Sequence, residues 1–418
     1  MVNTDQKLIN LRREFHRCAE TGWLEFETTI KIIKYLKSFG YKVKYGKEIH
    51  GDRMGLPDSD AIKKHKETIS IDTDFDVSEI LDGYTGAVGI LDTHKDGPVI
   101  ALRFDIDANG IEESNDKEHR PTMEGFASKK PNAMHACGHD GHIAIGLTVA
   151  EQLAMDKHHL SGKYILIFQP AEEGVRGAKS IVESGILKDV DYLISGHIGL
   201  GAEENEIVCG TIGFLATSKL DIYFEGKPAH AGANPEMGKN ALLAASNCAL
   251  NLHTLTQFGR GMSRLNVGIL KAGTARNIVP HKAFMEIETR GENGDVNSLL
   301  LQKVYQVIEG SARSFDVKYR IVEAGGAPAY NNLDKSFIDG LVEVLKKKNM
   351  KITTGKSLGA SEDITYMMNE VERNGGKSVY LMFGTKLTAP HHNNRFDFDE
   401  SVLNLAYEAY LEIIRSLL

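Results

Sequence analysis

The chain of 418 residues is long enough for two domains, because single hydrophobic cores rarely grow beyond about 300 residues. Its 49 basic and 57 acidic residues give a formal net charge of −8, without the basic block that nucleic-acid binding requires. No apolar run approaches the ~18 residues of a membrane span, and the opening MVNTDQKLINLRREF has no stretch typical of a signal peptide. The four scattered cysteines favour a reducing compartment. We therefore expect a soluble cytoplasmic protein with neither nucleic acid nor membrane as a partner.

The first half of the chain predicts helices that alternate with buried strands. Residues 5–17 and 28–39 have the apolar spacing of helices. Residues 97–107, 163–173 and 190–199 are near-continuous apolar runs that end in Asp, Glu or His, as parallel strands buried on both faces do. Because ligands bind beyond the carboxyl ends of such strands, these polar residues are expected in one crevice. An ordinary strand-to-loop transition is the alternative for any single run.

From about Ser218 to Glu323 the pattern changes to strand, helix, strand, strand, helix, strand, which is the ferredoxin-like βαββαβ unit. The expected elements are residues 218–227, 240–255, 264–270, 282–291, 296–315 and 317–324. Another strand, at residues 375–384, precedes the polar segment APHHNNRFDFDE. We therefore predict an α/β protein in which residues 1–215 and 327–418 form one discontinuous domain and residues 216–326 form an inserted one.

Metal-binding residue types recur in the loops of the larger predicted domain. The segments that carry them are MHACGHDGH, QPAEEG, GHIG and APHHNN. Transition metals bind thiolate, imidazole and carboxylate groups from several chain segments. The candidates are Cys137, His139, Glu172, Glu173, His197 and either His391 or His392. Each histidine alone is more often a surface or capping residue, but the whole set predicts a metal site.

These motifs resemble the dinuclear-metal amidohydrolases, a family that includes aminoacylase, hippurate hydrolase, glutamate carboxypeptidase and the plant auxin-conjugate hydrolases. Matching segments occur along the whole chain: LRREFHRCAETGWLEFETT, IALRFDIDA, MHACGHDGH, IFQPAEEGVRGAKSIVESG, GHIG, GKPAHAGANPEMGKNAL, AGTARNIVPHKA, ASEDITYMM and HHNNRFDFDE. Within the family, DRMGLP, HRPTMEGFAS, GTARNIVP and the doubled histidine are most similar to the branch of p-aminobenzoyl-glutamate hydrolases, in its catalytic-type chains. Cys18 and Ala19 depart from the His-Pro that relatives often carry there.

The resemblance implies a mixed-sheet α/β metallopeptidase-type catalytic domain, with the inserted domain acting as a lid and dimerisation domain. It also implies two divalent ions per chain, manganese or zinc, with cobalt tolerated. The ligands it implies are Cys137, His139, Glu173, His197 and His392. His392 is preferred to His391 because relatives place a histidine immediately before the small polar residue that precedes NRF. Either Cys137 or His139 could be the ligand shared by the two ions.

The resemblance assigns further roles around the metals. Glu172 is implied as the general base, and Asp107 as the acid that orients a ligand. His230 is implied to steady the oxyanion, from its own chain or from a partner chain. Asn277 and Arg290 match positions that grip the carboxylate of the substrate. Asp140 and His142 are more simply explained by the start of a helix than by the chemistry.

The expected reaction is hydrolysis of the amide bond of an N-acyl amino acid. The leading substrate is p-aminobenzoyl-glutamate, which would give p-aminobenzoate and glutamate. A broader aminoacylase or a small-peptide carboxypeptidase is the alternative enzyme, and a non-catalytic metal-binding subunit is the alternative of another class. The presence of Glu172 beside every ligand position argues against a non-catalytic role. The expected assembly is a homodimer or a pair with a homologous second subunit.

Overall fold

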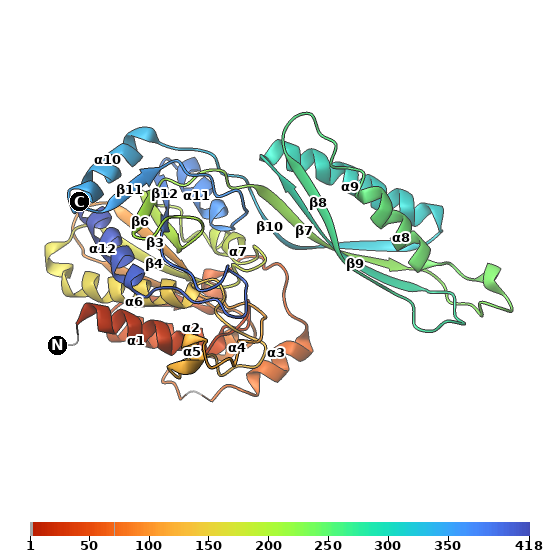
Figure 1. Cartoon of the computed structure of the whole chain (residues 1–418), viewed down its shortest axis with the longest axis horizontal. Helices are drawn as coiled ribbons and strands as arrows, with labels where there is room; N and C mark the ends of the chain where they lie inside the picture. The colour runs from red at the N-terminus through yellow and green to blue at the C-terminus, as the bar shows by residue number, and fades with distance from the viewer. Residues whose placement is uncertain (1–2, 71) are drawn as a thin grey trace. The chain divides into compact units, whose positions relative to one another are not determined.

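The computed structural model describes residues 3–70 and 72–418, which fold as two compact units (Figure 1). Unit 1 comprises Met1–Ile212, Asn332–Leu358 and Tyr366–Leu418, and unit 2 comprises Gly213–Asn331 and Gly359–Thr365. Unit 2 is thus slightly longer at both ends than the predicted insertion, and it includes a short later segment that the chain pattern did not assign to it. Among the described residues, no helix has the length and apolar character needed to cross a membrane.

Within the described residues, unit 1 contains an eight-stranded mixed sheet in the order β1-β2-β4-β3-β5-β12-β6-β11. Its strands are β1 (Lys42–Tyr45), β2 (Ala87–Asp92), β3 (Val99–Asp105), β4 (Lys163–Gln169), β5 (Tyr192–Ile198), β6 (Glu206–Cys209), β11 (Lys351–Thr354) and β12 (Lys377–Phe383). The neighbours β4, β3, β5 and β12 are parallel, so their carboxyl ends share one edge. These four strands confirm the predicted apolar runs. The sequence pattern missed the shorter β1, β2, β6 and β11.

The helices of unit 1 pack around a central buried helix, α6. They are α1 (Thr4–His16), α2 (Phe26–Ser38), α3 (Ser59–Lys66), α4 (Ser78–Leu81), α5 (Arg120–Met123), α6 (His139–Met155), α7 (Ala178–Glu183), α10 (Lys335–Lys346), α11 (Ile364–Arg373) and α12 (Ser401–Ser416), with 3₁₀ turns η1 (Gly46–Ile49) and η2 (Lys157–His159). Helix α6 packs on β3 and β4, and α1 and α12 flank it (Figure 1). Helices α1 and α2 confirm the two predicted at the start of the chain.

Glycines set both the start of α6 and its distance from the sheet. Gly138 has φ 88°, which favours glycine and allows the helix to begin at once with His139. A Cβ on Gly146 would lie 2.7 Å from the ring of Phe104 and 2.9 Å from that of Phe168. The ring of Phe104 also packs against Tyr410 of α12, with centroids 5.3 Å apart. The close packing of α6 on the sheet therefore fixes the position of its first turn.

Unit 2 has the predicted βαββαβ order of elements. These are β7 (Ala216–Glu225), α8 (Ala241–Leu252), β8 (Ser263–Ala272), β9 (Lys282–Gly291), α9 (Gly294–Ser314) and β10 (Lys318–Ala327), with the 3₁₀ turn η3 (Pro235–Met237) after β7. The strands pair antiparallel in the order β10-β7-β9-β8 within the described chain. Both helices pack on one face of this sheet and form a separate hydrophobic core with it.

Gly146→Ala is expected to lower the free energy of unfolding by about 1–3 kcal/mol, because the new methyl group overlaps two aromatic rings. Gly340→Ala in α10 is the matched control, since a Cβ there meets no atom within 4 Å. Helix propensity makes that change stabilising by up to about 1 kcal/mol. Urea unfolding of the two variants measures both effects. Equal stability of the two would contradict the packing described for α6.

Candidate metal centre

Four chain segments bring polar side chains together at the carboxyl edge of the parallel strands. Asp107 lies two residues beyond the end of β3, and the loop after β4 carries Glu172 and Glu173. His197 is the penultimate residue of β5. The fourth segment runs from Cys137 into the first turn of α6. The strand ends that the sequence predicted to share a crevice are therefore adjacent.

The five predicted ligands lie in overlapping groups. Donor atoms of Cys137, His139 and His197 lie within 4.8 Å of one another, and so do those of Cys137, Glu173 and His392. A further group joins His139 to Glu173 and Glu172, the predicted base. Cys137 Sγ is 3.4 Å from His197 Nε2, and His392 Nε2 is 3.1 Å from Glu173 Oε1. The structure thus places all five, with Glu172, in one cluster.

Hydrogen bonds orient the two buried histidines for metal binding. His139 Nδ1 donates to the Asp107 carbonyl oxygen at 2.8 Å, and His197 Nδ1 donates to that of Ile198 at 2.8 Å. These contacts assign the Nε2 lone pair of each ring to the cluster. Within the described chain, His139 Nε2 is buried and has no hydrogen-bond partner. A buried nitrogen without a partner, among thiolate, imidazole and carboxylate donors, fits a divalent transition metal.

The electrostatics of the cluster favour a cation. Burial acts to lower the pKa of His139, but the carboxylate of Asp105 outweighs it and raises that pKa well above its usual value. Burial and the charge of Glu173 raise the pKa of the Cys137 thiol, so a bound metal must displace its proton. Burial and His142 lower the pKa of His197, which keeps its imidazole neutral. The cluster therefore holds protons where a metal would hold positive charge.

Asp107 holds the loop that carries Glu172 and Glu173. Its Oδ1 accepts the backbone N–H of Glu172 at 3.0 Å, and its Oδ2 accepts that of Glu173 at 2.9 Å. Together with its carbonyl contact to His139, these bonds join two ligand segments. The carboxylate is 1% exposed, so few other partners are available to it. Asp107 thus has the orienting position that the family resemblance implied.

Glu25 is a buried carboxyl group behind the same loop, and the sequence reasoning missed it. Its Oε1 accepts the N–H of Ala171 at 2.8 Å, and its Oε2 accepts the hydroxyl of Thr85 at 2.6 Å. Ala171 has φ 53°, a strained value for alanine that such contacts help to maintain. Burial and the charge of Asp107 raise the pKa of Glu25 to about 8. Its sequence signal was an acid inside the otherwise apolar segment WLEF.

Other histidines near the cluster are already used. His142 Nε2 accepts the N–H of Ile198 at 3.0 Å, and its Nδ1 bonds Asp105. His391 Nε2 donates to the carbonyl oxygen of Ile198 at 3.2 Å, whereas the neighbouring His392 lies beside Glu173. This arrangement favours His392 over His391 as a ligand.

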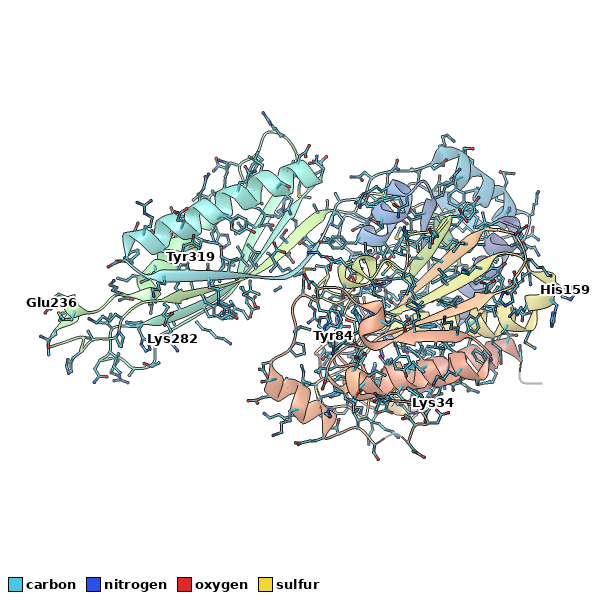
Figure 2. All side chains as sticks on the ribbon, turned by 180° about the vertical axis from the view of Figure 1, so that it is seen from behind. Lys34, Tyr84, His159, Glu236, Lys282 and Tyr319 are labelled. Atoms are coloured by element: carbon cyan, nitrogen blue, oxygen red, sulfur yellow. The ribbon has the colours of Figure 1, made fainter. Side chains whose placement is uncertain are left out.

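His230 of unit 2 has a defined tautomer. Its Nδ1 accepts two backbone N–H groups, from Gly232 at 3.1 Å and from Ala233 at 3.0 Å. The proton of the neutral ring is therefore on Nε2, which makes this exposed imidazole a hydrogen-bond donor. Asn277 lies beside it, because its carbonyl oxygen accepts the N–H of Ala231 at 3.0 Å. Figure 2 labels Glu236 in the loop after His230, at the tip of unit 2.

Arg290 lies at the opposite end of the same sheet. It pairs with Thr217 near the end of β9, whereas the loops of His230 and Asn277 follow the pair Glu225–Lys282 at the start of that strand. The strand between these pairs spans roughly 27 Å at ~3.4 Å per residue. Arg290 Nε bonds Glu288 at 2.7 Å. Within one chain, Asn277 and Arg290 are therefore not brought together, although the sequence assigned both to one carboxylate.

Comparison with known proteins identifies the family. The model of the peptidase family M20/M25/M40 matches residues 101–416. The chain belongs to this family. Its membership and its named relatives make it a metal-dependent amidohydrolase. The resemblance found in the motifs is thereby confirmed.

Named relatives cover nearly the whole chain. It is 41% identical over 408 residues to the A chain of the two-part p-aminobenzoyl-glutamate hydrolase of Escherichia coli, which covers 96% of this chain and 94% of the relative. It is 42% identical over 412 residues to indole-3-acetyl-aspartic acid hydrolase of Enterobacter agglomerans, with 95% and 92% covered. The solved aminobenzoyl-glutamate utilization protein from Klebsiella pneumoniae matches with a TM-score of 0.83 and 36% identity, covering 98% of this chain and 96% of the other.

Asp107→Asn is expected to lower the Zn²⁺ affinity about 10- to 100-fold, because the amide can accept only one of the two N–H bonds that hold the loop. Competition with a chelator measures the affinity. Asp92→Asn, at a partly exposed position on β2, is the control and should bind Zn²⁺ as the wild type does. Unchanged affinity in Asp107→Asn would remove the orienting role from this residue.

Proposed function

We propose that the protein hydrolyses the amide bond between an aromatic acyl group and an acidic amino acid, with p-aminobenzoyl-glutamate as the leading substrate. The observation that carries the proposal is the cluster itself, in which the carboxylate of Glu172 lies within 4.8 Å of ligand atoms of His139 and Glu173. A site that only stored metal would have no use for a further acid beside its ligands. This favours an enzyme over a non-catalytic metal-binding protein.

We propose Cys137, His139, Glu173, His197 and His392 as the ligands of two divalent ions. Cys137 is common to two of the ligand groups, so its thiolate is the best candidate for a shared ligand. Such ions would polarise the amide carbonyl and make a bound water acidic enough to react near neutral pH. Zinc, manganese and cobalt all suit the mixed donor set, and zinc is the best match to the thiolate.

Residues of the chain itself would move the protons. Glu172 accepts a proton from the attacking water and returns it to the departing amine. Its backbone N–H is fixed on Asp107, so the side chain starts from a defined position. The Nε2–H of His230 would donate to the oxyanion that forms on the carbonyl oxygen. A guanidinium such as that of Arg290 would bind the carboxylate of the amino-acid half.

The names of the relatives narrow the substrate class. One relative is named for an aromatic acyl-glutamate and another for an aromatic acyl-aspartate. An aromatic acyl group on an acidic amino acid is the chemistry that these two names share. This supports our proposed class over a broad aminoacylase or a small-peptide carboxypeptidase.

A panel of amides tests the proposed function. Zn²⁺- and Mn²⁺-loaded protein would be assayed on p-aminobenzoyl-glutamate, indole-3-acetyl-aspartate, benzoyl-glycine, an acetylated neutral amino acid and a dipeptide. The highest kcat/KM is expected for p-aminobenzoyl-glutamate, and the two acidic substrates should both exceed the neutral ones. A preference for the dipeptide or for the acetylated amino acid would overturn the substrate proposal.

Glu172→Gln is expected to keep both metals and to lose about 100-fold or more in kcat, because the amide cannot take the proton of the water. Glu173→Gln is the matched variant on the same loop, and it should lose metal as well as activity. Elemental analysis and steady-state rates separate the two effects. Metal loss in Glu172→Gln but not in Glu173→Gln would exchange the two roles.

The separation of groups within unit 2 supports an active site shared between two chains. His230 and Asn277 lie at one end of the sheet and Arg290 at the other, too far apart to contact one small substrate. We therefore propose that His230 and Asn277 act on a neighbouring chain, while Arg290 serves its own. The neighbour is a second copy or a homologous second subunit. The name of the Escherichia coli relative, which designates one lettered component of its enzyme, supports the second possibility.

Unit 2 has features that suit such pairing. Strand β8 is an edge strand of the sheet in the described chain, so its outer hydrogen-bonding groups are available to another strand. Helix α8, which packs beside it, exposes Leu243 and Leu250 on successive turns of one side. Exposed apolar side chains next to an open sheet edge are typical of a protein–protein contact. The four buried, unpaired cysteines support a cytoplasmic location for the assembly.

His230→Ala is expected to lower turnover about 100-fold or more without loss of metal, because it removes one donor to the oxyanion. Mixing inactive His230→Ala chains with inactive Glu172→Gln chains should restore activity, since one site of the mixed dimer then has both groups. Tagged co-purification would verify the mixed dimer. The absence of rescue in that dimer would contradict the shared site.

A further inference from the structure

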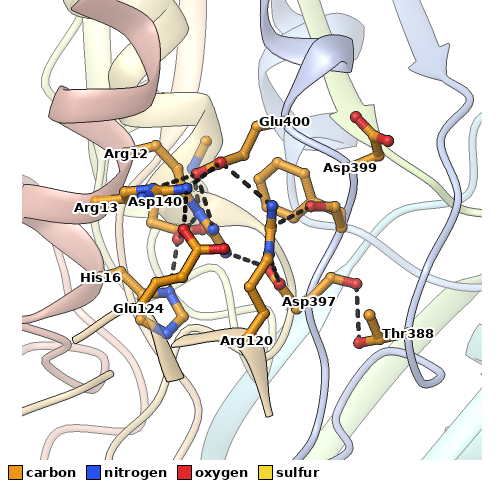
Figure 3. A network of polar contacts seen from close by, with 12 residues as sticks. Arg12, Arg13, His16, Arg120, Glu124, Asp140, Thr388, Asp397, Asp399 and Glu400 are labelled. Atoms are coloured by element: carbon orange, nitrogen blue, oxygen red, sulfur yellow. Dashed lines mark hydrogen bonds and ion pairs between the residues drawn. The ribbon is translucent and has the colours of Figure 1, made fainter. Parts of the chain in front are cut away.

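We propose that Arg12 and Arg120 position the metal ligand His392, by fixing the loop that carries it to the first turn of α6. We call residues 388–397 the histidine loop. The two arginines lie at the centre of the polar network in Figure 3, which joins α1, α5, α6 and the C-terminal segment. The inference rests on the proposed function, because it concerns the geometry of the proposed metal site.

Arg12 connects the two ligand segments directly. Its Nε donates to Asp140 Oδ2 at 2.7 Å, and Asp140 follows the ligand His139 in the chain. Its Nη2 donates to Asp397 Oδ1 at 2.8 Å, at the end of the histidine loop. Its Nη1 donates to Glu400 Oε1 at 3.2 Å. One guanidinium therefore links segments that are more than two hundred residues apart in sequence.

Arg120 holds the base of the histidine loop from another side. Its Nε and Nη2 bind both oxygens of Asp397, at 2.5 and 2.8 Å, and Nη2 also donates to the carbonyl oxygen of Phe398 at 2.7 Å. The planar guanidinium fits this carboxylate in a two-pronged contact. Asp397 in turn closes the loop, because its carbonyl oxygen accepts the N–H of Thr388 at 2.9 Å.

The far part of the histidine loop has its own contact with the ligand segment. The N–H of His392 donates to the carbonyl oxygen of Ala136, next to Cys137, at 2.8 Å. His392 adopts φ 61°, which is uncommon for a non-glycine residue and needs support from its surroundings. Its side chain is 55% exposed, so burial does little to hold the ring. The position of His392 therefore depends on the anchors of its loop.

The network is a costly way to obtain stability alone. Arg12, Asp140 and Asp397 have fully buried side chains, and Arg12 lies between the rings of Phe126 and Phe398, at 5.0 and 4.5 Å from their centroids. Removing these charges from water offsets much of their attraction, and apolar residues of similar volume often stabilise a fold as well. The directional bonds of the guanidinium groups do what apolar packing cannot, because they specify how the two segments align.

His16 adds a further anchor to the same carboxylate. Its Nδ1 bonds Asp140 Oδ2 at 2.7 Å and its Nε2 bonds Glu113 Oε1 at 3.0 Å. Burial acts to raise the pKa of Asp140, but Arg12 and His16 outweigh it and hold that pKa well below its usual range. Asp140 is thus a charged anchor and not only an acid in the first turn of a helix, as the sequence suggested.

The test is a stepwise Zn²⁺ titration of metal-free protein in competition with a chelator. Wild type should bind two ions, and His392→Ala identifies the step to which that ligand contributes. Arg120→Met should weaken the same step about 10-fold or more and leave the other within about 2-fold. Arg120→Lys, which keeps the charge but not the two-pronged contact, should recover part of the affinity.

Arg13→Met is the matched control. Arg13 also binds Glu400, at 2.7 Å, and packs over Phe126, but its bonds are to Glu400 and Glu124 and not to Asp140 or Asp397. It should bind both ions as wild type does, and its metal-free form should unfold at the same temperature as Arg120→Met. Arg12→Lys is a second variant that keeps the buried charge, and it should weaken the His392 step as well.

Two results would overturn the inference. They are wild-type affinities in Arg120→Met and Arg12→Lys, or an equal loss of both binding steps together with a lower unfolding temperature of the metal-free protein. A loss in Arg13→Met as large as that in Arg120→Met would likewise reduce the network to a structural role. Wild-type protein that binds no Zn²⁺ would instead overturn the proposed function, and this inference with it.

Discussion

The hydrogen bonds of Asp107 are the constraint on which the candidate centre depends. Its carbonyl oxygen fixes the ring of His139, and its two carboxylate oxygens fix the backbone of Glu172 and Glu173. Base and ligand are thereby placed on consecutive residues with different tasks. The parallel strands β3 and β4 make this possible, because they end side by side and deliver Asp107 and the loop to the same edge.

Much of the site was predictable because its residues follow local patterns. Buried parallel strands are apolar runs with polar ends, so β3, β4, β5 and their terminal acids and histidine could be read from the chain. The five ligand positions came from motif resemblance, and the structure groups them. The four-residue strands β1, β6 and β11 could not be predicted in the same way, since so few residues carry no recognisable period.

Other features depend on distance in space, which the sequence does not record. Glu25 and Arg12 lie on or beside helices near the start of the chain, and their partners lie more than a hundred residues away. The sequence assigned Asn277 and Arg290 to one carboxylate, but the antiparallel register of β7 and β9 separates them along the sheet. Register is thus what turns a list of substrate-binding residues into an argument for two chains at one site.

The central claim is that Cys137 joins two metal ions, and anomalous diffraction tests it most directly. Data from Zn²⁺-soaked crystals at the zinc absorption edge should show two anomalous peaks per chain in unit 1, each about 2.3 Å from Cys137 Sγ. One should also contact His197 and the other Glu173 and His392. A single peak, or two peaks of which neither contacts Cys137, would contradict the account.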